Sequence, residues 1–263
     1  MSFRLLIGAK LPLLLGLLAL SSAASRAEAK SEFPPPPVLD PVEAGRAGRA
    51  LAAELANRRP EQGLTNTGVF KIRDPKGQVR KVPVRFTMLT TATNWINLYE
   101  AAVPDGARVE LTIVHAEMQP NQYFLGKFPA SSSSSTAPQR LTGSQLMVSF
   151  AGSDFWLADL GLEFLHWPEQ RLLRKELRLG RSCDVLESLN PEPVPGGYAR
   201  VVSWLDRDTG GILHADAYEI GKELLKKFEP KELKKVQGQY MLEEMEIRNH
   251  QTGARTKVEF NLP

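Results

Sequence analysis

The region between Tyr198 and Phe260 contains the longest run of strand signals in the chain, and short turns join them. Residues 198–205 are rich in β-branched and aromatic side chains, and residues 206–211 then supply the Asp, Thr and Gly of a turn. In residues 255–262 apolar or hydroxyl side chains alternate with charged and polar ones, as in a strand packed on one face. These features predict consecutive antiparallel hairpins at the carboxyl-terminal end.

Two more strands are expected inside this region. The segment 212–220 has apolar residues at both odd-numbered and even-numbered positions, so both of its faces should carry apolar surface. Strict alternation would put Ile212, His214, Asp216, Tyr218 and Ile220 on one face and Leu213, Ala215, Ala217 and Glu219 on the other. The chain continues through 224–228 and returns as a strand at 239–248, and the turn sequence at 249–253 leads into the last strand.

A helix is predicted at the start of the folded region. Asp40 is an N-cap candidate, Pro41 suits the first helical position, and good helix formers continue to Leu55. The helix should end before Pro60, because proline lacks the backbone donor that a helix interior needs.

From residue 67 the hydrophobic period changes to two. A hairpin joins residues 69–74 to a long strand in which Pro83 removes one ladder donor, so an edge position or a bulge is expected there. A serine run at 131–135 predicts a loop. The other strands expected before residue 198 are 94–102, 109–113, 122–126, 144–150, 169–179 and 181–189.

The segment 155–165 is the most apolar irregular part of the chain. Its large apolar residues are too dense for one amphipathic stripe, although a short helix starting at Ser153 or Asp154 is expected within it. Such a segment is either deeply buried or covers something apolar that is not always present.

The order of these elements shows no alternation of strands and helices and no fixed repeat. The fold class predicted is therefore mainly β with minor α. We expect a curved antiparallel sheet of about 11 to 13 strands that forms an unclosed barrel. The amino-terminal helix and the short internal helix would fill or cap its opening.

The amino terminus has the pattern of a cleaved secretory signal. Arg4 and Lys10 precede an apolar run at 11–20, and small residues follow it. Ten apolar residues are too few to span a bilayer as a helix, and no cysteine follows the run to carry a lipid. We therefore expect a signal peptide at 1–29, a proline-rich tether at 30–39, one β domain at 40–263 and a periplasmic location.

The composition argues against several classes of function. Removing residues 1–29 takes away three basic residues and one acidic residue, so the net charge falls from +3 to about +1 and no nucleic-acid partner is expected. The four histidines lie in separate segments, and Ser153 is not followed by the glycine of a nucleophile elbow, so neither a metal nor a catalytic site is predicted. No cofactor is expected, and Cys183, the single cysteine, is interpreted as a buried strand residue.

Several short motifs carry a resemblance to a known family. The sequence from about residue 143 to the end resembles outer-membrane lipoprotein-sorting (LolA-like) proteins. The residues that carry it are AGSDFWLADL at 151–160, Trp204-Leu205-Asp206, Ala215-Asp216-Ala217-Tyr218, Gly221-Lys222, Met245-Glu246-Ile247 and Thr252-Gly253-Ala254-Arg255-Thr256. This resemblance implies an unclosed antiparallel barrel wrapped around helices, with an apolar interior that takes up lipoprotein acyl chains.

Methionines and aromatic residues on the expected strands are the candidates for such an interior. Flexible thioethers beside aromatic rings suit a surface that accepts varied hydrocarbon, although the same residues would serve as ordinary core. The predicted wall or cover of a lipid site comprises Val84, Phe86, Met88, Trp95, Leu111, Ile113, Trp156, Leu160, Trp204, Met241 and Met245.

The function expected from the resemblance is non-catalytic binding of lipoprotein acyl chains or another envelope lipid. It would allow an inner-membrane exporter or an outer-membrane acceptor as a partner, with at most peripheral membrane contact, and we expect a monomer. Two alternatives remain open: a regulatory protein that senses lipid with the same fold, and an envelope hydrolase. Retained lipid would indicate a carrier or sensor, and altered product would indicate an enzyme.

The signal-peptide prediction has a direct test. If cleavage follows Ala24 or Ala29, the protein secreted from its native host begins between Ser25 and Lys30. Amino-terminal sequencing of the secreted chain measures this. An uncleaved chain held in membranes by its own amino terminus would contradict it.

Overall fold

The computed structural model describes residues 39–129, 137–236 and 239–262, so the predicted signal peptide, nearly all of the tether and the serine run lie outside the described residues. The helices are α1 (Pro41–Ala56) and α2 (Leu157–Leu160), with 3-10 turns η1 (Gly143–Leu146) and η2 (Glu163–His166). The strands are β1 (Leu64–Arg73), β2 (Val79–Thr90), β3 (Asn94–Ala102), β4 (Arg108–Ala116), β5 (Gln122–Phe128), β6 (Gln139–Leu141), β7 (Glu169–Arg178), β8 (Arg181–Leu189), β9 (Arg200–Asp206), β10 (Ile212–Tyr218), β11 (Leu224–Val236), β12 (Gln239–Asn249) and β13 (Arg255–Phe260).

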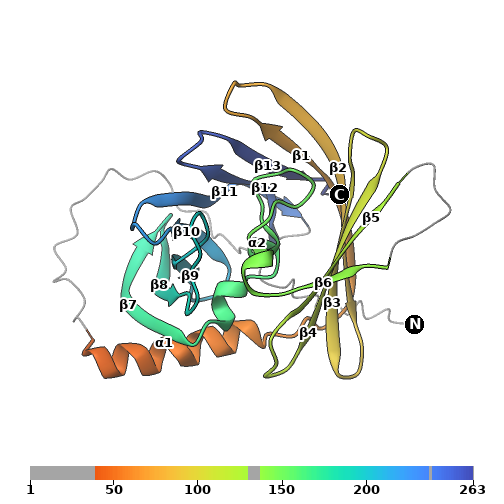
Figure 1. The fold of residues 1–263 in the computed structure, drawn as a ribbon. Coiled ribbons are helices and arrows are strands. Elements are labelled where there is room, and N and C mark those ends of the chain that lie inside the picture. Colours follow the sequence, from red (N-terminus) through yellow and green to blue (C-terminus); the bar gives the residue numbers. More distant parts are fainter. Residues whose placement is uncertain (1–38, 130–136, 237–238, 263) are drawn as a thin grey trace.

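All of these strands belong to one antiparallel sheet of 13 strands, which confirms the predicted fold class. The order is β6-β5-β4-β3-β2-β1-β13-β12-β11-β10-β9-β8-β7, so almost every neighbour in space is also a neighbour in sequence. The exception is the pairing of β1 with β13, which joins the two halves of the chain. The sheet curls around a central space without closing, and α2 lies inside the curve (Figure 1).

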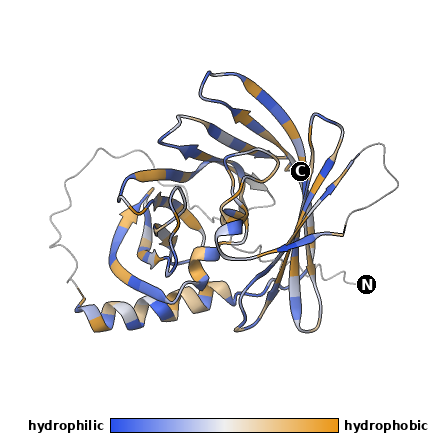
Figure 2. Cartoon of the chain, in the orientation of Figure 1, coloured by the Kyte–Doolittle hydropathy of each residue, from blue (hydrophilic) through white to orange (hydrophobic). Residues whose placement is uncertain are grey.

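Alternation of side chains divides the curled sheet into an inner and an outer face. In β3 the buried residues are Trp95, Asn97, Tyr99 and Ala101, every second position of the strand. Figure 2 shows the same alternation of hydrophobic and hydrophilic residues along most strands. The inner face is therefore largely apolar, and this is where the main hydrophobic core forms.

Three local predictions about the strands need correction. Pro83 lies on β2, an interior strand between β1 and β3, where it pairs with Val69 of β1 and sits just beyond the last β2–β3 pair, Val84 with Ala101. Residues 144–150 do not form a strand, because this segment leaves the edge β6 and turns inward to bury Leu146 and Phe150. The short strand β6 was not predicted.

Strict alternation also fails at the start of β10. The pairing of β10 with β9 shifts between Ile212 and His214. As a result Ile212 packs on the same cluster as Ala215 and Ala217, while Leu213 joins the opposite face. One extra residue in a strand moves the side chains before it to the opposite face of the sheet. The sequence contains no motif that predicts this shift.

The amino-terminal helix forms as predicted and covers an edge of the sheet. The Asp40 carboxylate accepts hydrogen bonds from the backbone N–H groups of Val42 and Glu43, at 3.0 and 3.1 Å, and so caps α1. The helix packs against the edge strand β7. Gly48 makes this possible, since a Cβ there would lie 2.6 Å from the backbone of Arg171. Covering an edge strand hides its unpaired backbone groups.

This close approach predicts opposite effects for two glycines of α1. Gly48→Ala should lower the free energy of unfolding by about 1 to 3 kcal/mol, because the new methyl group meets rigid backbone. Gly45→Ala should leave it unchanged or raise it by up to about 1 kcal/mol, because its Cβ would meet only the flexible Arg49 side chain, at 3.2 Å. Urea unfolding of both variants measures the difference, and equal effects would show that α1 does not need the contact.

Candidate functional site

The space inside the curled sheet is occupied by residues 150–167, which we call the plug. The plug follows η1 and leads into β7. Phe150, Phe155, Leu157 and Leu160 are each at most 3% exposed, so it forms the centre of the core rather than a surface loop. Of the two alternatives expected for the segment 155–165, the structure shows deep burial of most of its large apolar side chains.

The local shape of the plug comes from hydrogen bonds of its own polar residues. The Ser153 hydroxyl donates to the carbonyl of Phe150 at 2.7 Å and accepts from the N–H of Phe155 at 3.2 Å. Asp159 accepts from the N–H of Trp156 at 2.7 Å and so begins the single turn α2. The helix was predicted to begin at Ser153 or Asp154, but it begins at Leu157, because the Ser153 hydroxyl is already engaged in the preceding turn.

One side of the plug is bound to β11, to β13 and to the segment just before β9 by buried polar contacts. The Lys226 ammonium donates to the carbonyl of Asp154 at 2.7 Å and lies 3.5 Å from the Asp159 carboxylate. Tyr198, two residues before β9, donates to the other Asp159 oxygen at 2.7 Å, and Thr256 donates to the Asp154 carboxylate at 2.8 Å. These contacts hold both ends of one plug segment to the sheet and to the segment that enters β9.

Aromatic rings surround the same ammonium group. The Lys226 nitrogen lies 3.4 Å from the centroid of the Trp156 ring, and that ring stacks on Tyr198 at 4.6 Å. A cation over an aromatic face is stabilised by the ring quadrupole, most strongly where water is excluded.

The opposite side of the plug is bound to β3 and to the start of β5. Tyr99 donates to the carbonyl of Leu160 at 3.0 Å, and Tyr123 donates to the Glu163 carboxylate at 2.8 Å. Asn121 donates to the carbonyl of Gly161 at 2.9 Å. Gly161 has no side chain to obstruct this contact, whereas a Cβ there would lie 2.1 Å from the Tyr123 oxygen.

Burial changes the ionisation of the charged groups on the plug and its partners. Burial lowers the pKa of Lys226 to about 8, although the neighbouring Asp159 and Asp154 oppose this change. Burial raises the pKa of Asp154, and it raises the pKa of Glu163 to about 7. The pKa values of Lys226, Asp154 and Glu163 are therefore shifted by the burial that the plug itself provides.

The plug divides the interior into three pockets. Pocket A has an empty volume of about 540 Å³ and lies against β9–β12; its lining includes Phe155, Tyr198, Val201, Ala217, Lys226 and Phe228. Pocket B, of about 450 Å³, is lined by Phe70, Val84, Phe86, Phe155, Leu160, Met245 and others. Pocket C, of about 490 Å³, lies beneath α1 and includes Trp95, His115 and Leu160. Phe155 thus separates A from B, and Leu160 separates B from C.

Most of the residues predicted for a lipid site lie on this interior. Val84, Phe86, Leu160 and Met245 line pocket B, and Trp95 lines pocket C, where it stacks on His115 at 5.1 Å. Met88, Leu111 and Ile113 are buried in the same core but are not part of the linings of pockets A, B and C. Trp156 contacts both Tyr198 and Lys226.

Two predicted residues lie elsewhere. Trp204 is on the outer face of β9, in a small cluster with Cys183, Val185, Val202 and Leu213, because the neighbouring positions Val201 and Leu205 take the inner face. The prediction that Cys183 is buried is confirmed. Met241 is half-buried, and its neighbour Leu242 takes the place in the core. Pairing shifts near Pro230 and Glu232 of β11 change which β12 residues face inward.

Phe155 belongs to the segment 155–165 that the sequence singles out, whereas Lys226 and Tyr198 were not predicted as parts of this site. A usable signal existed for Lys226: it lies two positions from Phe228 on the same strand, so alternation places a charged residue on an otherwise apolar face. Tyr198 carries no signal that separates it from ordinary core residues.

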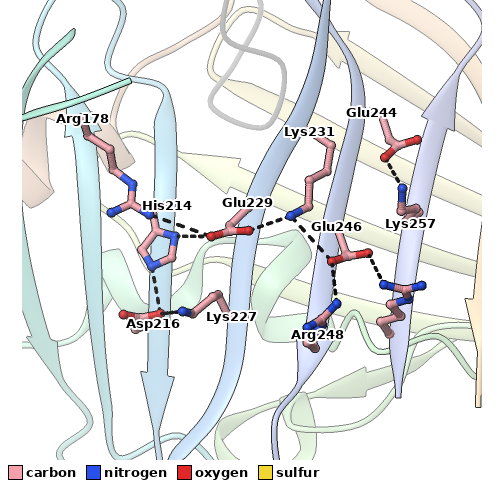
Figure 3. Close-up of polar contacts among 11 residues, drawn as sticks. Arg178, His214, Asp216, Lys227, Glu229, Lys231, Glu244, Glu246, Arg248 and Lys257 are labelled. Atoms are coloured by element: carbon pink, nitrogen blue, oxygen red, sulfur yellow. Dashed lines mark hydrogen bonds and ion pairs between the residues drawn. The ribbon is translucent and has the colours of Figure 1, made fainter. Parts of the chain in front are cut away.

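The outer face of β10–β13 carries a connected set of charged residues (Figure 3). Glu229 lies 3.2 Å from His214 and 2.7 Å from Lys231, and Lys231 also approaches Glu246 at 3.7 Å. Glu246 is 5% exposed and has Arg248 and Arg255 as further partners. Because these charges have partners on adjacent strands, we interpret the network as support for the sheet rather than as a site.

Comparison with solved structures identifies the fold. A DUF1329 family protein from Desulfovibrio piger matches with 21% identity and a TM-score of 0.63, over 83% of this chain and 91% of that chain. A domain from Vibrio parahaemolyticus, described as a putative outer membrane lipoprotein-sorting protein domain, matches with 20% identity and a TM-score of 0.65, over 83% and 92%. A LolA superfamily protein from Nitrosomonas europaea matches with 18% identity and a TM-score of 0.52, over 84% and 95%. This chain has the LolA-like fold.

Sequence comparison adds little to the assignment of the LolA-like fold. A family model described only as an uncharacterized protein matches residues 132–262, just under half of the chain. No curated protein matches the sequence significantly. In this chain the LolA-like sheet surrounds a plug that leaves apolar pockets on both of its sides.

Two further features of this LolA-like chain bear on the site. No group of three or more histidine, cysteine, aspartate or glutamate side chains that could hold a metal is present in the described residues. Within the same residues, no helix has the length and hydrophobicity needed to cross a membrane.

Glu163 predicts a pH dependence for the attachment of the plug. Its pKa rises from 4.5 to about 7 in the folded protein, so the folded state keeps a proton that the unfolded state has released. The free energy of unfolding should therefore fall as pH rises from 4.5 to 7, and Glu163→Gln should remove this contribution, about 1 to 2 kcal/mol for a partly exposed carboxyl. Denaturation of both proteins across this range tests it, because other groups cancel in the difference. A constant difference would contradict the prediction.

Proposed function

We propose that this chain is a periplasmic, non-catalytic binding protein that holds acyl chains of a lipoprotein or of another envelope lipid inside its half-barrel. The main support for the proposal is the position of Phe155. This side chain of the plug lies between two apolar pockets inside a LolA-like sheet. The resemblance of residues 143–263 to lipoprotein-sorting proteins and the predicted signal peptide support the same conclusion.

The chemistry of the two pockets favours hydrocarbon. Pocket B is lined by aromatic and aliphatic side chains with Arg85 as its one charged residue. Pocket A is similar except for Lys226, Asp159 and Tyr198, which are already bonded to one another or to the plug. An apolar lining with a few polar groups is typical of small-molecule sites.

The free space consists of narrow gaps between side chains, so an acyl chain must displace part of the plug. Burying an acyl chain contributes about 0.8 kcal/mol of favourable binding free energy per methylene, before the entropy cost of ordering the chain. About 14 methylenes therefore give on the order of 11 kcal/mol. Exposing two or three large apolar side chains costs about 1.5 to 3 kcal/mol each, and each broken hydrogen bond costs about 0.5 to 1.5 kcal/mol. The filled and plugged states are therefore close enough in energy for lipid to compete with the plug.

The polar groups of the plug suit this role better than catalysis. Asp154 and Asp159 each accept hydrogen bonds that attach the plug to the sheet. Lys226 gives its hydrogen bonds to the same segment. Because these bonds link the plug to β11, to β13 and to the segment just before β9, they contribute to the free energy that a ligand must supply to move it.

Filling either pocket should block binding. Ala217 lines pocket A and Val84 lines pocket B, so Ala217→Phe and Val84→Phe place a ring where an acyl chain would lie. Each should weaken binding of a fluorescent C16 fatty acid by about tenfold or more. Ala102→Phe is the matched control, because Ala102 is exposed at the end of β3. Circular dichroism checks the fold of each variant.

The results separate the possibilities clearly. If the folded pocket variants and the control all bind fatty acid as tightly as the parent, the interior is not the lipid site. If a phenylalanine prevents folding, Ala217→Val and Val84→Leu offer smaller fillings of the same two pockets. A parent protein that neither retains lipid on gentle purification nor binds the probe would contradict the proposed function.

Movement of the plug has its own test. The side chains of Asp154 and Thr256 hydrogen-bond at 2.8 Å, so we choose these two positions for a pair of cysteines whose disulfide, once mass spectrometry shows that it has formed, would tie the plug to β13. The oxidised double variant should lose fatty-acid binding, and reduction should restore it. Cys183 is fully buried and should not interfere. Equal binding in the two redox states would show that this part of the plug stays in place when lipid binds.

A further inference from the structure

Pocket C differs from pocket B because several nitrogen-bearing side chains line it. They are Arg58, Asn97, His115 and His166. Phe86, Tyr99 and Leu160 line both pockets, so the two lie side by side. A ligand that occupies pocket B can therefore extend into pocket C once Leu160 of the plug moves aside.

One polar atom of pocket C lacks a hydrogen-bond partner. Asn97 lies on β3 and is only 7% exposed. Its amide nitrogen lies 3.1 Å from Nε2 of His115, whereas its Oδ1 is buried and accepts no hydrogen bond from the described residues. Buried polar atoms are nearly always hydrogen-bonded, because taking them out of water without a partner costs free energy. A ligand with a donor group would supply the missing bond.

His115 determines which end of the Asn97 amide is free. Burial lowers the pKa of His115 to about 4, so its ring is uncharged at neutral pH. The ring stacks on Trp95, with the ring centroids 5.1 Å apart, and its Nε2 lies toward Asn97. An uncharged imidazole has one accepting nitrogen, and here the Asn97 nitrogen donates to it. Oδ1 is therefore the end that remains for a ligand, and it is an acceptor.

The charge at pocket C is already paired within the described residues. Burial lowers the pKa of His166, so this ring is also uncharged at neutral pH. Arg58 is the one charged residue of the lining. Its guanidinium lies 3.2 Å from the Glu54 carboxylate and also donates to the carbonyl of Thr209. The pocket is therefore better suited to an uncharged donor than to a carboxylate or a phosphate.

We propose that pocket C holds the polar head of the bound lipid, and that this head donates a hydrogen bond to Asn97 Oδ1 from an uncharged amide or hydroxyl group. The inference rests on the proposed function, in which an acyl chain displaces part of the plug. Plug residues 160–162 line pocket C, so the same displacement gives the head access to Asn97. The substrate class is then a lipid with an amide N–H or a hydroxyl group next to its acyl chain, and not a free fatty acid. A few well-placed polar groups in an apolar site fix the orientation of a ligand in this way.

Two neutral ligands that share one acyl chain and one carbonyl test the proposal on the full secreted chain. N-methyldodecanamide has one N–H group, and N,N-dimethyldodecanamide has none. Each is titrated against the bound fluorescent C16 fatty acid. The N-methyl amide should displace this probe at about a five- to tenfold lower concentration, because it alone can donate to Asn97 Oδ1. Dodecanoate should bind no more tightly than the dimethyl amide.

Variants of β3 show whether Asn97 causes the preference. Asn97→Leu should bring the ratio of the two displacing concentrations close to one, because leucine has no acceptor. Asn94→Leu is the matched control, since alternation places this asparagine of the same strand on the opposite face, and it should keep the preference. Circular dichroism checks the fold of both variants, and Asn97→Ala replaces Asn97→Leu if the leucine prevents folding.

The outcomes separate this inference from the proposed function. Equal displacement by the two amides in the parent, or a preference that persists without Asn97, would overturn the inference while the interior still binds lipid. Tightest binding of dodecanoate would overturn it as well, because the pocket would then select a negative charge. If neither the probe nor any of the three ligands binds the parent, the proposed function itself fails.

Discussion

The structure depends on the need to cover the inner face of a curled sheet. A sheet of 13 strands with an apolar concave face exposes that face to water unless something fills the curve. Here the filling is a segment of the chain itself, residues 150–167, and not a separate layer of helices. Phe150, Phe155 and Leu160 take the place of a conventional core, so stability and any cavity are properties of the same few side chains.

A core made by an irregular segment raises a problem of unsatisfied polar groups. Backbone groups in a short turn such as α2 lack the ladder that a strand provides. The sheet supplies partners instead: Tyr99 reaches the carbonyl of Leu160, and Lys226 reaches the carbonyl of Asp154. Buried charges are costly, and their retention here gives the plug one position rather than maximal stability. A single closed position held by these contacts agrees with the proposed function, in which a ligand displaces part of the plug.

The apolar surface inside the half-barrel lies around the plug. Pocket B is lined mainly by aromatic side chains, whereas pocket A combines aromatic and aliphatic side chains with the bonded polar groups Lys226, Asp159 and Tyr198. The same side chains of the plug therefore decide both how the core packs and how much apolar space remains beside it.

The sequence by itself determined the local structure of this protein. Period-two alternation, turn residues and the Asp40 cap predicted α1 and most strands within a few residues, because these depend on neighbours in the chain. Only the tertiary structure decided which face curves inward, where β10 shifts register, and that Trp204 and Leu213 lie outside. It also decided that Lys226, Tyr198 and Thr256 meet the plug, since these contacts join segments 39 to 102 residues apart and leave no periodic trace in the sequence.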